Sequence, residues 1–142
     1  MSQLSLQPFP NSLIEPFIET SPQTPRYNCI AWAYGTDQVR LWPGNPYYMW
    51  PDGIPTYNTI DSFIKLFASI GYIECENGDL VEGVEKIAIY EYGGIPTHAA
   101  KQLENGLWSS KLGDAWDVSH SLNSIRDGYY GKEVVFMSRN RE

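Results

Sequence analysis

The sequence predicts an α+β fold in which N-terminal helices pack on a small antiparallel β-sheet, within a single domain of residues 1–142. Two helical segments come early in the chain, and strand-like segments joined by short glycine-containing turns dominate the second half. Hydrophobic residues make up 42% of the chain and charged residues 19%, a balance typical of a compact protein with one core.

Residues 1–26 are expected to form an extended arm that packs on the core. Prolines at five positions in this stretch prevent a long helix or a central strand. Several apolar side chains recur at helical spacing around Pro16, which favours packing over a free tail: Leu13, Ile14, Phe17 and Ile18.

The first helix is predicted at residues 29–34, because Asn28 is a good N-cap and Gly35 a good terminator. A second helix begins after Asn58 and ends at Gly71, with apolar residues at a spacing of three and four that mark its core face. The remaining predicted elements are strands at 72–75, 84–90, 97–103, 107–112 and 133–138, and a helix over 114–125 capped by Asp114.

Residues 40–57 form a loop rich in Trp and Tyr and interrupted by Pro and Gly. A long aromatic loop is typical of a lid or of the wall of a binding groove. The alternative is that Trp42 and Trp50 fold back onto the core. In the groove interpretation, the candidate substrate-binding residues are Trp32, Trp42, Trp50 and Trp108.

Charge and composition restrict the partners of the chain. Its formal net charge of −7 repels phosphate backbones, so nucleic acid is not an expected partner. The first twenty residues lack an export signal and no stretch is long enough to cross a bilayer, so we expect a cytoplasmic protein with no membrane partner. No metal or other cofactor is expected, since no paired Cys or His motif occurs, and Cys29 and Cys75 are predicted free thiols.

Cys29 is the candidate catalytic nucleophile. In the first turn of a helix, a thiol faces unpaired backbone N–H groups and the positive end of the helix dipole, which lower its pKa. His98, in a predicted strand, is the best candidate base, because His120 falls in a predicted helix where a structural role is the default. The backbone N–H of Cys29 could bind an oxyanion, with Gln23 or Tyr27 as an additional side-chain donor.

The third catalytic group depends on the turn at Asn105-Gly106. A two-residue type I′ turn would place Ser109 on the face of His98, whereas a G1 bulge at Gly106 would place Ser110 there. Asp114 is a stronger acceptor for an imidazolium but already has a role as a helix cap. Ser110 and Asp114 therefore remain rival candidates for the residue that orients His98.

These motifs resemble the papain-like superfamily and, within it, the compact bacterial NlpC/P60-like cysteine hydrolases. The resemblance covers residues 23–138 and rests on Cys29 at a helix start and on the hairpin from His98 to Ser110. It implies a helix packed on an antiparallel sheet, a Cys29–His98 pair oriented by Ser110, and Gln23 at the spacing of the oxyanion glutamine. The family usually has Asp before the cysteine, where this chain has Asn28, and a larger polar residue in the third position.

Two hypotheses about function follow. In the first, the chain is a cysteine hydrolase or acyltransferase that attacks an amide or thioester, with a peptide, a protein amide or a peptidoglycan peptide as substrate. In the second, it is a non-catalytic binding module for a protein partner, such as an immunity or effector-associated protein. The state of the Cys29 thiol distinguishes them, because a catalytic thiol is accessible and ionised near neutral pH whereas a packed thiol is inert.

Overall fold

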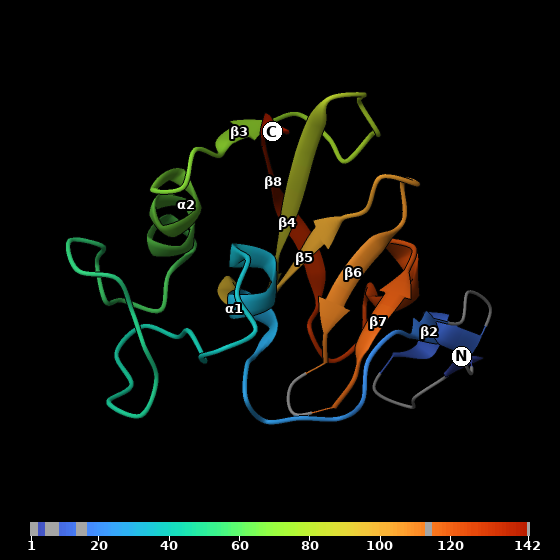
Figure 1. Ribbon diagram of the computed structural model, residues 1–142, viewed down its shortest axis with the longest axis horizontal. Coiled ribbons are helices and arrows are strands. Elements are labelled where there is room, and N and C mark those ends of the chain that lie inside the picture. Colours follow the sequence, from blue (N-terminus) through green and yellow to red (C-terminus); the bar gives the residue numbers. More distant parts are fainter. Residues whose placement is uncertain (1–2, 5–8, 14–16, 113–114, 142) are drawn as a thin grey trace.

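The structure, a computed structural model, describes residues 3–4, 9–13, 17–112 and 115–141 (Figure 1). These residues build one antiparallel sheet of eight strands in the order β1-β2-β7-β6-β5-β4-β8-β3. The strands are β1 (Gln3–Leu4), β2 (Phe17–Glu19), β3 (Ile73–Cys75), β4 (Val84–Tyr92), β5 (Ile95–Gln102), β6 (Trp108–Lys111), β7 (Asp117–His120) and β8 (Lys132–Asn140). Two short 3₁₀ helices lie at Pro10–Leu13 and Asn123–Ile125.

The expected α+β fold of papain-like type is wrong, because the described part of the chain is mainly β. Its only α-helices are α1 (Cys29–Tyr34) and α2 (Ile60–Ala68). The N-terminal arm contributes β2 to the sheet, and residues 117–120, predicted as helix, form β7 between β2 and β6. No helix among the described residues is long and apolar enough to span a lipid bilayer.

Side-chain caps begin both α-helices, and a left-handed glycine ends α1. The Asn28 side chain accepts a hydrogen bond from the Ala31 N–H, and Gly35 ends α1 in the left-handed conformation with φ of 117°. The predicted bounds of this helix are confirmed. Helix α2 is capped by Thr59 rather than by Asn58, one residue later than predicted.

The sheet is covered on both faces, so that its central strands are buried on both sides. Helices α1 and α2 pack on one face, called here the helix face, with core residues that include Ile30, Leu66, Phe67, Ile87, Ile89, Ala99 and Met137. The arm and the segment after β7 cover the other face, called here the arm face, with core residues that include Phe9, Phe17, Tyr90, Ala100, Val118, Ile125 and Tyr130.

The β5–β6 hairpin fixes which side chains share a face. Leu103 donates to the Leu107 carbonyl and Gly106 to the Leu103 carbonyl, with Gly106 at φ of 89°. A single left-handed glycine at the end of a three-residue loop is the G1-bulge arrangement, the second of the two turns considered from the sequence. It places Ser109 opposite Lys101 and therefore on the helix face, and it turns Ser110 toward the arm face.

Candidate functional site

Cys29 lies in the first turn of α1, as predicted, but its thiol is packed into the core of the helix face. The residue is 6% exposed and contacts the sheet beside Ala99. Burial raises the pKa of the thiol to about 11, although backbone hydrogen bonds from Ala99 and Ile30 and the charge of Lys111 act in the opposite direction. The activation expected from the helix start is therefore outweighed by desolvation, and Cys29 is a neutral thiol at physiological pH.

His98 and Cys29 lie on opposite faces of the sheet. Along β5, Ala99 faces α1 whereas His98 is turned the other way, where its ring stacks on Tyr130 at 4.0 Å between centroids and meets Tyr90 edge-on at 5.5 Å. The His98 imidazole cannot reach the thiol through the sheet. The predicted Cys29–His98 pair is thus not assembled in this structure.

His98 instead belongs to a buried chain of hydrogen bonds on the arm face. Its Nε2 lies 2.9 Å from Ser110 Oγ, which lies 2.7 Å from Nε2 of His120. Nδ1 of His120 is 2.7 Å from the Ser121 carbonyl, which can only accept, so neutral His120 carries its proton on Nδ1. Ser110 must then donate to His120 and accept from the Nε2–H of His98, which gives every proton in the chain one position.

This His98–Ser110–His120 chain stays uncharged at neutral pH. Burial lowers the pKa of His120 from 6.5 to about 4, although its bond to the Ser121 carbonyl acts the other way. Burial, and then repulsion from His120, lower the pKa of His98 well below its usual range. The predicted contact between His98 and Ser110 is present, within a cluster of buried, neutral imidazoles.

The structure describes two of the other predicted site residues, Gln23 and Tyr27. Gln23 is exposed, whereas Cys29 is buried. Asp114 lies outside the described residues. Tyr27 donates its hydroxyl to the Asp117 carboxylate at 2.7 Å, and burial with this bond raises its pKa to about 12.

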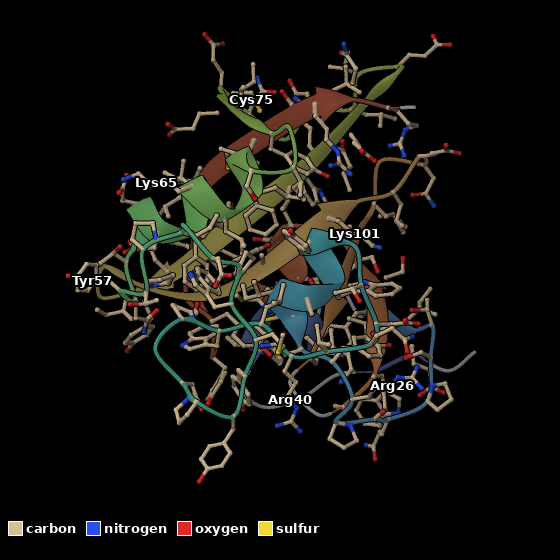
Figure 2. All side chains as sticks on the ribbon, turned by 60° about the vertical axis from the view of Figure 1, so that its left-hand side comes forward. Arg26, Arg40, Tyr57, Lys65, Cys75 and Lys101 are labelled. Atoms are coloured by element: carbon tan, nitrogen blue, oxygen red, sulfur yellow. The ribbon has the colours of Figure 1, made fainter. Side chains whose placement is uncertain are left out.

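The four tryptophans proposed for substrate binding lie on both faces of the sheet. The Trp32 indole donates to Ser109 Oγ at 2.9 Å, and Figure 2 shows Lys101 beside α1, with its ammonium 3.7 Å from the Trp32 ring centre. Trp42 and Trp50 pack on Phe63 at 5.3 and 5.7 Å between ring centroids. Trp108 is buried on the arm face. These side chains therefore line no common groove.

Specific hydrogen bonds link the loop of residues 40–57 to Asn28 and join its two halves. The Asn28 amide clamps it at Leu41, with Nδ2 donating to the carbonyl at 2.7 Å and Oδ1 accepting from the N–H at 3.0 Å. Across the loop, Met49 donates to the Arg40 carbonyl, and Trp42 donates to the Met49 carbonyl. The Trp50 indole donates to the Pro55 carbonyl at 3.1 Å. The inward tryptophans and these bonds tie the loop to α1 and to α2.

The same loop exposes three other large side chains. Tyr47 is 90% exposed, Tyr57 72% and Met49 60%, and these three residues are called here the aromatic surface. Sequence reasoning emphasised the tryptophans of the loop and passed over the tyrosines. The signal in the sequence for exposed rings was the position of these tyrosines between prolines and glycines. An irregular backbone of this kind cannot turn every aromatic ring toward the core.

The fold and this site define a mainly β protein with a hydrogen-bonded aromatic loop and a buried, protonated cysteine. The chain belongs to the family described as a domain of unknown function (DUF7689), whose family model matches residues 18–138. No curated protein and no solved structure matches the chain.

Proposed function

We propose that the chain is a non-catalytic protein-binding module that contacts its partner through the aromatic surface of Tyr47, Met49 and Tyr57. The observation that carries this proposal is the exposure of three large side chains on a loop whose backbone is braced by specific hydrogen bonds. Exposed apolar side chains gain stability only when another surface covers them.

The chemistry of the aromatic surface suits a protein partner. Tyrosine and methionine are enriched at the centres of protein interfaces, where tyrosine combines a large apolar ring with one hydrogen-bonding group and few rotatable bonds. Because the loop is already ordered by Asn28 and by its inward tryptophans, binding costs little backbone entropy. Arg40, stacked on Tyr48 at 5.4 Å, adds a cationic side chain beside the surface.

The competing hypothesis of a cysteine hydrolase or acyltransferase has less support. A cysteine nucleophile needs a base within hydrogen-bond reach, and His98 faces away from Cys29 across the sheet. The thiol also lacks the low pKa and the accessibility of a nucleophile. The cytoplasmic location expected from the sequence stays a prediction.

Site-specific photo-crosslinking tests the proposal. A benzophenone amino acid replaces Tyr47 in one protein and Tyr129 in a control, since Tyr129 is 71% exposed but lies between β7 and β8, outside the loop. We expect a discrete crosslinked protein from position 47 in cells that make the chain naturally, and none from position 129.

The captured protein is then purified and its affinity measured. The double variant Tyr47→Ser and Tyr57→Ser is expected to bind about tenfold or more weakly, the range of interface hot-spot residues. The matched control is Tyr92→Ser with Tyr129→Ser, which removes two tyrosines of similar exposure. Equal loss of affinity in both double variants, or none in the first, would contradict a binding role for the aromatic surface.

A further inference from the structure

A second exposed apolar surface lies far from the aromatic surface, at the end of the sheet where β4 begins and β8 ends. A hollow of about 500 Å³ is lined there by Leu80, Val81, Glu82, Val84, Glu104 and Arg141, and is called here the end groove. Its volume lies within the range of sites that hold small ligands or a few peptide side chains. In Figure 2, Cys75 of the neighbouring strand β3 lies well away from Tyr57.

The end groove is preformed, because the loop that builds its wall is tied to the sheet. The Asn77 carbonyl accepts from Lys86 Nζ at 2.9 Å, and the Gly78 carbonyl accepts from the Gln102 amide at 2.7 Å. The Gly83 carbonyl accepts from the Arg141 N–H at 2.8 Å. A ligand would therefore meet a fixed surface rather than a loop that must first be ordered.

Apolar side chains form the wall and floor of this groove. The side chains of Leu80 and Val81 are 50% and 46% exposed, and a bound partner would cover this apolar surface. Leu80 leans on the β5–β6 turn at Gly106, next to the partly exposed Leu107. The exposed leucine and valine side chains give the groove an apolar character that an apolar side chain of a ligand would match.

Two carboxylates, those of Glu82 and Glu104, line the groove beside its apolar side chains. Glu82 is exposed, and no ion pair among the described residues engages it. Glu104 is 80% exposed at the groove edge and only 3.9 Å from the Arg141 guanidinium, which also lies 3.6 Å from Glu85. The charged side chains of the lining are therefore two carboxylates and one guanidinium, in a chain whose net charge is −7.

We infer that the end groove binds a basic, apolar peptide segment of a protein partner, with its aliphatic side chains against Leu80 and Val81 and its Lys or Arg side chains beside the carboxylates of Glu82 and Glu104. Charge complementarity selects such a segment over an acidic one and increases its rate of association. This surface is separate from the aromatic surface, so the inference stands independently of the function proposed above.

A peptide titration followed by NMR tests the inference. The probe is a short capped peptide of alternating leucine and lysine, and two controls replace either its leucines with serine or its lysines with glutamate. We expect the probe to shift the amide signals of residues 80–84, 104 and 141, and both controls to bind about tenfold or more weakly. Binding should weaken as salt is added, because exposed charges are screened.

Variants of the chain assign the site. Leu80→Ser is expected to reduce probe affinity about tenfold, and Glu82→Gln about threefold with a weaker dependence on salt. Asp52→Asn removes an exposed carboxylate of the aromatic loop and is expected to leave affinity unchanged. Equal binding of the leucine-glutamate peptide, shifts confined to other surfaces, or full affinity in Leu80→Ser would overturn the inference. The double variant Tyr47→Ser and Tyr57→Ser is expected to bind the probe peptide with unchanged affinity. This result would show that the end groove and the aromatic surface bind independently.

Discussion

Nε2 of His98 lies 2.9 Å from Oγ of Ser110, on the face of the sheet that points away from α1. Ser110 also bonds to His120, and all three side chains are buried. The hydroxyl is the only group among the described residues that satisfies Nε2 of both imidazoles. Its loss would leave two polar nitrogens buried without partners.

Replacement of Ser110 with Ala is expected to lower the free energy of unfolding by about 2 to 6 kcal/mol, since it leaves two buried polar groups unsatisfied and each costs about 1 to 3 kcal/mol. The matched control is Ser109→Ala, which removes a single hydrogen bond, from the half-buried Trp32 indole, and should cost about 1 kcal/mol. Urea unfolding measures both. Equal losses in the two variants would argue against the bridging role of Ser110.

The free energy of unfolding is expected to fall as the pH drops below about 6.5. The pKa of His120 is about 4 in the folded chain and 6.5 when unfolded, so the unfolded chain binds more protons between these values. The stability that depends on neutral His120 is therefore fully present above pH 6.5. It decreases as the pH falls and is almost entirely lost near pH 4. At pH 5, protonation of His120 in the unfolded chain lowers the free energy of unfolding by about 2 kcal/mol.

The variant His120→Gln isolates this effect, because a glutamine can bond to Ser110 but does not titrate. Between pH 7 and pH 5, its unfolding free energy should fall by about 2 kcal/mol less than that of the wild type. Carboxylates titrate in both proteins and cancel in the comparison. Parallel pH profiles for the two proteins would show that His120 is not held neutral by burial.

Asn28 is expected to be required as an amide, because it links α1 to the aromatic loop. An aspartate would keep the bonds to the Ala31 and Leu41 N–H groups but would place a carboxylate oxygen against the Leu41 carbonyl, where the amide now donates at 2.7 Å. Asn28→Asp should destabilise the fold by about 1 to 2 kcal/mol and accelerate amide exchange at Met49. The control Asn58→Asp alters an exposed asparagine and should change neither.

Local signals in the sequence located most of the elements. Asn28 and Gly35 bound α1 as predicted, and alternating or β-branched residues marked β4, β5, β6 and β8, because these features depend on neighbours in the chain. The segment 114–125 was mispredicted, since a cap-like Asp114 favoured helix while Val118 and its neighbours are in fact a central strand. A strand's place between two others depends on tertiary pairing, which no local pattern contains.

The relation of Cys29 to His98 could not be predicted from local patterns. Strand β5 carries alanines at 99 and 100, one on each face, and both are fully buried. A strand buried on both sides has no polar alternation to show which face receives a helix. The sequence therefore indicated that His98 and Ser110 could share a face, given a G1 bulge, but contained nothing to indicate that α1 packs on the opposite one.

The most direct test is the rate of iodoacetamide alkylation of the two cysteines in the native protein, measured by mass spectrometry across pH. Cys29 is expected to react about a hundredfold or more slowly than the partly exposed Cys75 at pH 8, because burial hides its sulfur and raises its pKa to about 11. The variant His98→Gln should leave this ratio unchanged. Faster reaction of Cys29 than of Cys75 at neutral pH, lost in His98→Gln, would contradict the account and restore the cysteine hydrolase hypothesis.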